Sequence, residues 1–254
     1  MRIITIALQK GGTGKSTTAH ALGQGLQHRG FKVLFVDLDP QGNLTSTMGA
    51  ETGESTAFDV LTKKATAQEA TQQTAQGTII PASPQLSSAD LELTQTGKEY
   101  RLKEALRPIE NQYDFCIIDT PPALGTLTIN ALTAATEVII PVQADTYSIQ
   151  GITQLYSTIG AVKEYCNPEL KVQGILITRY NNRAILSRDL AEIIDTTAKK
   201  LGTRLFKTTI REGIAVKESQ ARREPLYTYA PASNPAQDYQ DLITEYLQDQ
   251  KGER

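Results

Sequence analysis

The 254-residue sequence contains no tryptophan, only two cysteines and few aromatic residues, 6% of the chain in all. Cys116 and Cys166 are too few for a disulfide framework or a CxxC metal site. Cys116 lies inside an apolar run, which predicts a buried thiol. No apolar stretch reaches the length of a membrane span, and no signal peptide precedes the first predicted strand. We therefore expect a cytoplasmic protein.

The net charge of −2 argues against a strongly basic DNA-binding protein, but the charges are unevenly distributed. Residues 1–150 carry 11 Lys and Arg against 15 Asp and Glu, and residues 231–254 carry 2 against 5. Residues 151–230 are basic, with 13 Lys and Arg against 8 Asp and Glu. This segment is a candidate polyanion footprint, although a solvated surface of uneven charge explains the counts equally well.

The dominant motif is a glycine-rich turn at 9–17, between an apolar run at 3–8 and a helical pattern at 18–26. Strand, glycine-rich turn and helix are the context of a phosphate-binding loop. Lys15 would reach the β- and γ-phosphates of a nucleotide, and the Ser16 hydroxyl would ligate Mg²⁺. The predicted nucleotide contacts are Lys10, Gly11, Gly12, Thr13, Gly14, Lys15, Ser16 and Thr17.

This loop departs from the strict phosphate-loop pattern in two ways. Gln9 stands where the pattern has glycine, and Lys10 is an additional lysine. Lys10 lies across the turn from Lys15, so one loop has difficulty aiming both ammonium groups at a single γ-phosphate. The hypothesis that follows is that Lys10 reaches the nucleotide of a facing subunit.

Two further predicted strands end in aspartates. The strand at 32–36 leads into Asp37 and Asp39, and carboxylates at the carboxyl end of a parallel strand point into the ligand crevice. Such a carboxylate can orient a water for in-line attack on the γ-phosphorus or hold Mg²⁺, so Asp37 is a second metal candidate. The apolar run ending at Asp119 is a Walker B pattern, which predicts that Asp119 supports the Mg²⁺ shell through a water molecule.

These three motifs, in this order, resemble those of the ParA/Soj family of deviant Walker A P-loop ATPases, within the ParA/MinD superfamily. The resemblance covers Ile3 to about Leu247, and the segment 37–43 favours the ParA/Soj branch over MinD. It implies an α/β P-loop NTPase fold, a mostly parallel twisted sheet with helices on both faces, in a single domain over residues 1–254. Because the chain starts at its first strand, we expect the short form without an N-terminal DNA-binding domain.

The resemblance also implies roles for particular residues. Lys10, Lys15 and Asp39 would be catalytic, with Lys10 acting across an ATP-bridged homodimer and Asp39 positioning water. Asn181 would contact the adenine, and Pro231 begins a turn beside the nucleotide. A basic C-terminal surface would bind nucleoid DNA non-specifically. Its predicted residues are Arg183, Arg188, Arg211, Lys217, Arg222 and Arg223.

The implied function is a slow ATPase with ATP and Mg²⁺, stimulated by a ParB-like partner, that segregates plasmid or chromosomal DNA. An alternative is a positioning ATPase of the same fold whose cargo is a protein assembly of the carboxysome or chemoreceptor type. A MinD-like division-site regulator is disfavoured because the acidic, polar C-terminal segment does not resemble a basic membrane helix. A nucleotide-binding protein without turnover is the non-enzymatic alternative.

The remaining pattern predicts the elements around these motifs. Further strands are expected at 78–83, 137–142, 172–178 and 204–208. Helices are expected at 92–106, 149–165, 185–200 and 238–247.

Overall fold

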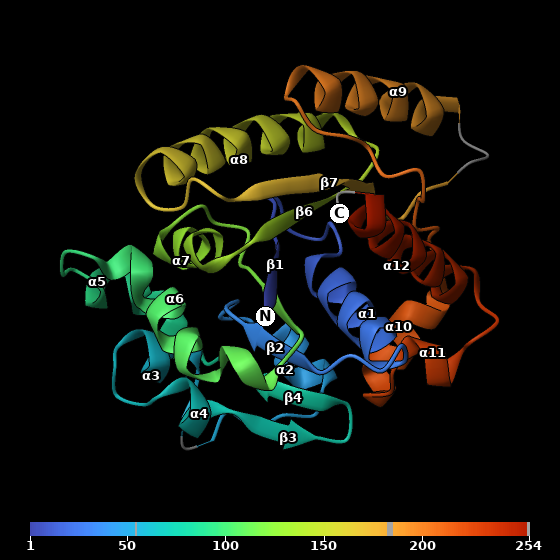
Figure 1. The fold of residues 1–254 in the computed structure, drawn as a ribbon. Helices are drawn as coiled ribbons and strands as arrows, with labels where there is room; N and C mark the ends of the chain where they lie inside the picture. The colour runs from blue at the N-terminus through green and yellow to red at the C-terminus, as the bar shows by residue number, and fades with distance from the viewer. Residues whose placement is uncertain (54, 182–184, 253–254) are drawn as a thin grey trace.

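A computed structural model describes residues 1–53, 55–181 and 185–252, and its centre is a seven-stranded sheet (Figure 1). The strand order is β3-β4-β2-β5-β1-β6-β7, and neighbouring strands run parallel except for the antiparallel β3–β4 hairpin. The strands are β1 Arg2–Ile6, β2 Val33–Asp37, β3 Gln72–Thr74, β4 Gly77–Ile80, β5 Phe115–Asp119, β6 Glu137–Val142 and β7 Lys171–Ile177. The predicted mostly parallel α/β fold is confirmed.

Helices cover both faces of this sheet. In Figure 1, α1 and α10–α12 lie on one side, α3–α7 lie on the other, and α8 and α9 pack beside β6 and β7. The α-helices are α1 Lys15–Gln27, α2 Asn43–Thr47, α3 Ala57–Leu61, α4 Ala67–Ala70, α5 Ala89–Glu92, α6 Arg101–Leu106, α7 Thr126–Ala134, α8 Thr146–Tyr165, α9 Ile185–Lys200, α10 Ile214–Arg222, α11 Leu226–Tyr229 and α12 Asn234–Gly252. Short 3₁₀ segments are η1 Pro84–Ser88, η2 Lys98–Tyr100 and η3 Arg107–Gln112.

The central strands are apolar along their whole length because both of their faces are buried. In β2, Phe35 packs into the core beneath α1 and α12, whereas Leu34 and Val36 pack into the core beneath α3, α6 and α7. Successive side chains of a strand point to opposite faces, so a continuous apolar run supplies both cores at once. The buried thiol of Cys116 belongs to the second core, as predicted.

The strand register brings the predicted carboxylates to one edge of the sheet. Asp37 is aligned with Asp119 across β2 and β5, and Ile6 of β1 is aligned with Asp119 on the other side. The loop that follows β1 therefore leaves the sheet beside both aspartates. This is the edge at which parallel sheets bind ligands.

Several predicted elements differ from the structure. The helix expected at 92–106 is broken into the end of α5, a turn at Gly97 with φ of 81°, and α6. The strand expected at 204–208 is reduced to one bridge between Leu205 and Ile175. Within residues 1–53, 55–181 and 185–252, none of the helices has the length and apolar character that crossing a bilayer requires.

Candidate functional site

The glycine-rich turn connects β1 to α1 and opens onto a cavity. Gly12 and Gly14 have φ angles of 75° and 83°, which residues with a side chain rarely adopt. A Cβ atom added at Gly11 or Gly12 would meet no atom within 4 Å, so the turn faces open space. The α1 helix begins directly after this turn, and its free N–H groups are available to an anion.

Lys15 is the buried cation of this turn. Its Nζ donates a hydrogen bond of 2.8 Å to the backbone oxygen of Lys10, across the turn. Burial lowers the pKa of Lys15, while the nearby carboxylates of Asp119 and Asp39 raise it. A phosphate group entering the turn would supply the negative charge that this buried ammonium lacks.

Asp37 organises the segment that follows β2. Its carboxylate accepts hydrogen bonds from the N–H of Asp39 at 3.0 Å and from the N–H and hydroxyl of Thr45 at 2.8 and 2.7 Å. Burial raises the pKa of Asp37 to about 6, against the effect of these hydrogen bonds. Both oxygens are thus occupied, Oδ1 by the Asp39 backbone and Oδ2 by Thr45 of α2, and the role of Asp37 as a metal ligand stays a prediction.

Asp119 is different, because neither of its buried carboxylate oxygens makes a hydrogen bond of good geometry with the described residues, although the Ser16 hydroxyl lies close enough to lower its pKa. Burial, followed by the neighbouring Asp37, raises its pKa well above the usual range. Orphaned buried oxygens are costly unless a cation or donor completes them. Asp119 and the Ser16 hydroxyl therefore fit a hydrated Mg²⁺ that also binds phosphate oxygens.

No group of three His, Cys, Asp or Glu side chains in the described part of the chain is arranged to hold a metal by itself. At a nucleotide site, Mg²⁺ is usually held by one or two protein ligands together with phosphates and waters.

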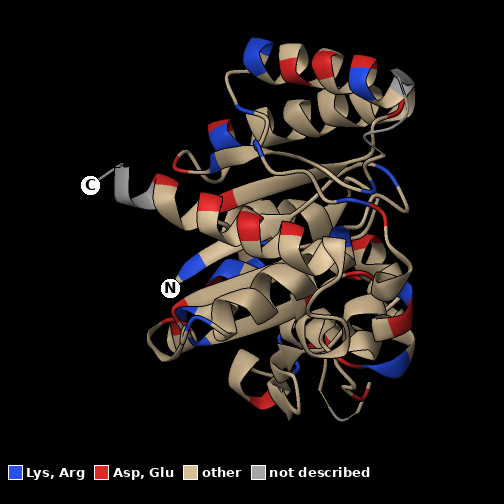
Figure 2. Cartoon of the chain, turned by 90° about the vertical axis from the view of Figure 1, so that its right-hand side faces the viewer, with Lys and Arg blue, Asp and Glu red and all other residues tan. Residues whose placement is uncertain are grey.

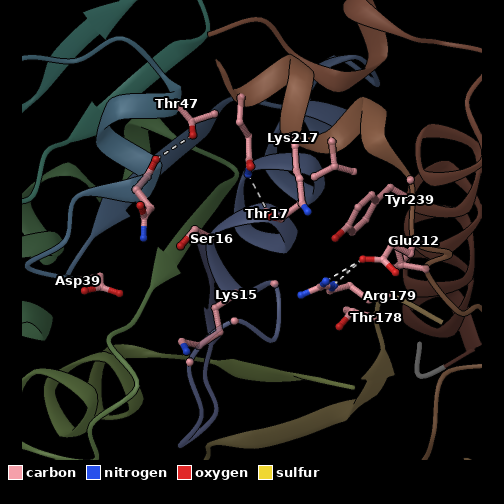
Figure 3. Close-up of a pocket in the computed structure, with 18 of the residues that line it drawn as sticks. Lys15, Ser16, Thr17, Asp39, Thr47, Thr178, Arg179, Glu212, Lys217 and Tyr239 are labelled. Carbon is pink, nitrogen blue, oxygen red and sulfur yellow. Dashed lines mark hydrogen bonds and ion pairs between the residues drawn. The ribbon is translucent and has the colours of Figure 1, made fainter. Parts of the chain in front are cut away.

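The cavity has a volume of about 610 Å³ and extends from the glycine-rich turn to the start of α10 (Figure 3). Asp39 lies at one end and the Arg179–Glu212 pair lies at the other, with Lys15, Ser16 and Thr17 between them. Other lining residues come from the α2 segment, α10 and the loop before it: Gln41, Asn43, Ser46, Thr47, Ile210, Arg211, Gly213, Val216, Lys217 and Gln220.

The end of the cavity far from Asp39 is built by the loops after β7 and before α10. The Thr178 hydroxyl donates to the backbone oxygen of Thr13 at 2.8 Å, which ties the end of β7 to the glycine-rich turn. Arg179 has φ of 51° and donates to one Glu212 oxygen from Nε at 3.1 Å and from Nη2 at 2.7 Å. Neither Asn181 nor Pro231 lines the cavity, and their predicted adenine and nucleotide contacts stay predictions.

Lys10 is held away from its own phosphate turn. Its ammonium forms an ion pair with Asp145, the N-cap residue of α8, and lies 6.0 Å from the centre of the Tyr147 ring. Burial opposes ionisation of Asp145, but Lys10 and the Ser148 N–H lower its pKa overall. Lys10 does not line the cavity, and its action on a facing subunit stays a prediction.

The residues predicted to bind DNA do not form one uniform group. Arg211 donates to both oxygens of Asp238 in α12, and Lys217 extends from α10 to the cavity rim (Figure 3). Arg188 in α9 and Arg222 and Arg223 at the end of α10 are exposed. Arg183 lies outside the described residues. The DNA-binding role of all six stays a prediction.

Sequence reasoning missed several residues of this site. Asp145, Arg179, Glu212 and Gln220 act through partners far away in the chain, such as the Gln220 amide that donates to the Thr17 hydroxyl at 3.0 Å. Only Asp145 carried a local signal, since Asp followed three residues later by Ser at the start of an apolar helix is an N-cap pattern.

Comparison with known proteins identifies similar chains over nearly the full length. The family described as an AAA domain matches residues 1–172. The sporulation initiation inhibitor protein Soj of Bacillus subtilis is 39% identical over 249 residues, covering 96% of this chain and 97% of Soj. The chromosome partitioning protein ParA of Myxococcus xanthus is 38% identical over 251 residues, covering 97% of this chain and 88% of ParA.

A solved structure of similar fold contains nucleotide and metal. It is that of cobyrinic acid a,c-diamide synthase from Mycobacterium smegmatis with a bound ATP analogue and magnesium. It is 34% identical, has a TM-score of 0.87 and covers 100% of this chain and 97% of its own. The names of these relatives differ, but the similarity to each spans the glycine-rich turn, the aspartates and the C-terminal helices.

Proposed function

The chain belongs to the Soj/ParA family of P-loop ATPases, and we propose that it partitions DNA by binding it in an ATP-dependent manner. It is an ATPase whose cofactors are ATP and Mg²⁺. The observation that carries the proposal is a phosphate turn with two lysines, Lys15 inside the cavity and Lys10 outside it, in a chain that matches Soj along its length. The name of the ParA relative, a chromosome partitioning protein, favours DNA over a protein assembly as cargo.

We infer the division of labour in hydrolysis from the positions of the side chains. Lys15 and the N–H groups at the start of α1 bind the phosphates, and Ser16 and Asp119 would hold Mg²⁺, which would supply positive charge to the phosphates. Asp39 lies at the cavity end opposite the Arg179–Glu212 pair, where its carboxylate can orient water for attack on the γ-phosphorus. Lys10 leaves Asp145 and reaches the phosphates of a second copy, so ATP joins two subunits.

The proposed DNA-binding surface avoids α12. Figure 2 shows Asp and Glu along that helix, and one of them, Asp238, pairs with Arg211. An acidic helix repels phosphates, so the exposed arginines of α9 and α10 are the better candidates. These are Arg188, Arg222 and Arg223, with Lys217 at the cavity rim. A ParB-like partner would stimulate hydrolysis and release the dimer from nucleoid DNA.

The test is retention of a mixed-sequence DNA duplex, measured with ATP, with ADP and without nucleotide over a salt titration. We expect retention only with ATP and a steep loss with salt, because phosphate contacts release counterions. The Asp39→Ala variant should stay on DNA with ATP, since its hydrolysis is blocked, and Lys10→Ala should bind ATP without dimerising. Retention that is equal in ATP and ADP would refute the proposal.

A further inference from the structure

The side chain of Gln76 joins three elements that lie far apart in the sequence. Gln76 is 6% exposed, in the turn between β3 and β4. Its Nε2 donates to the backbone oxygens of Thr47 at 2.6 Å and Arg223 at 2.8 Å. Its Oε1 lies 2.8 Å from Nε2 of His20 in α1. One buried amide therefore contacts the phosphate-turn helix, the end of α2 and the end of α10.

Chemistry fixes the orientation of this amide. Both backbone oxygens can only accept hydrogen bonds, so the NH₂ group of Gln76 must face them. Oε1 then accepts the Nε2–H of His20, which is a neutral imidazole because burial lowers its pKa to about 4. The Gln24 amide donates to the backbone oxygen of Gln76 at 2.5 Å and fixes the turn itself. The side chain is satisfied in this arrangement and in no flipped one.

The first carbonyl that Gln76 binds, that of Thr47, ends the segment that follows the Asp39 loop. Thr47 is the last residue of α2, a helix of five residues that begins just after that loop. Asp37 holds the middle of α2 through Thr45. The N–H of Gly42 donates to the backbone oxygen of Asp39 at 2.8 Å. The backbone at Asp39 and the short helix α2 are therefore hydrogen-bonded into one segment that ends at the Thr47 carbonyl.

The second carbonyl is that of Arg223, the exposed residue that ends α10. Arg223 is the C-cap of that helix and has φ of 53°, a left-handed conformation that residues with a Cβ rarely adopt. The hydrogen bond from Gln76 to its carbonyl helps hold this conformation. Arg222 lies beside it, with its guanidinium 5.3 Å from the centre of the Tyr229 ring. The direction of both arginines thus depends on the Arg223 backbone.

From this geometry we propose that Gln76 is a positioning residue that couples the Asp39 loop to the Arg222–Arg223 pair. Its two N–H groups bind one carbonyl from each side, so α2 cannot move without pulling on, or releasing, the end of α10. The inference rests on the proposed DNA-binding function and names a route by which nucleotide controls it. The Gln220 amide, in the last turn of α10, donates to the Thr17 hydroxyl at 3.0 Å and gives the same end of the helix a second link to α1.

The test compares Gln76→Met with Gln73→Met. Methionine keeps the length of glutamine without its hydrogen bonds, and Gln73 is an exposed neighbour in β3 whose change should have no effect. We expect Gln76→Met to bind an ATP analogue and dimerise as the parent chain does, while its ATP-dependent affinity for DNA falls by about tenfold or more. The salt slope should become shallower by about 3.6, since two arginines in each of two subunits stop contacting phosphates at 0.9 per contact.

The outcomes separate this inference from the proposed function. If the parent chain shows no ATP-dependent DNA retention, the proposed function fails. If it does, and Gln76→Met retains DNA equally well, the coupling is refuted. If Gln76→Met loses both ATP binding and DNA retention, the coupling is also refuted, because Gln76 would then only support the fold.

A second measurement uses the unmodified chain and does not depend on how a variant folds. Hydrogen exchange should show residues 222–226, none of which lines the cavity, gaining protection together with residues 43–48 when an ATP analogue binds. Protection of 43–48 without any change at 222–226 contradicts the coupling.

Discussion

Asp145→Asn is expected to strengthen ATP-dependent dimerisation, because it releases Lys10. In the proposed dimer, Lys10 would have to leave its ion pair with Asp145 to reach the phosphates of a second subunit. The two side chains are 24% and 32% exposed, so the pair contributes about 0.2–1 kcal/mol. Two pairs break in each dimer, and the dissociation constant should therefore fall by about 2- to 30-fold. Sedimentation of the chain with a non-hydrolysable ATP analogue measures it.

Asparagine suits this experiment because it preserves the other role of Asp145. The Ser148 N–H donates to Asp145 at 2.9 Å, and asparagine caps a helix about as well as aspartate. Asp195→Asn is the matched control, since it removes the same charge from an exposed pair with Lys199 on α9, away from the cavity. A dimer that is unchanged or weaker in Asp145→Asn would show that the Lys10–Asp145 pair does not compete with dimer formation.

Three other changes test the site and its support. Asp119→Asn should not lower the melting temperature of the nucleotide-free protein, because both carboxylate oxygens are buried without a hydrogen bond of good geometry. It should reduce the rise in melting temperature on adding Mg²⁺ and ATP, by about 3–5 °C for each tenfold loss of affinity for them. Gly23→Ala places a Cβ 2.2 Å from the buried Phe35 ring and should lower the melting temperature, whereas Gly160→Ala in α8 meets nothing within 4 Å and should raise it. Burial lowers the pKa of His20 to about 4, so between pH 4 and 6.5 the unfolded chain binds more protons than the folded chain, and stability falls as the pH drops. Urea titrations should show that the free energy of unfolding falls by about 2 kcal/mol between pH 7 and 5. The His20→Gln variant should lack this loss.

The phosphate turn and the aspartates could be predicted because their signals are local. A glycine-rich turn between a strand and a helix, and aspartates that end apolar strands, are visible within about ten residues of sequence. Parallel pairing then forces Asp37 and Asp119 to the same edge, and the structure has them in register. The sheet order itself required the tertiary structure.

The contacts that connect these motifs had no such signal. Lys10 and Asp145 are 135 residues apart, and Gln76 and Arg223 are 147 apart. The broken helix at 92–106 has a related cause, because Gly97 turns the chain so that the Asn130 amide can accept the N–H of Leu102. Apolar spacing predicted a continuous helix there, because it contains no information about the hydrogen bond that Asn130 of α7 makes with this segment.

In the proposed dimer, the charges in the cavity would explain why nucleotide, metal and a second subunit act together. Asp37, Asp39 and Asp119 lie near one another, and Lys15 is the buried cation that faces them. A bare triphosphate would add negative charge beside these carboxylates, so Mg²⁺ at Ser16 and Asp119 has to accompany it. Lys10 is the nearby lysine whose charge is not already directed into this cavity, since Asp145 holds it outside. Transfer of the Lys10 ammonium to a phosphate in another copy would complete the neutralisation of the phosphate charge. Loss of the γ-phosphate would remove the negative charge that holds the ammonium there.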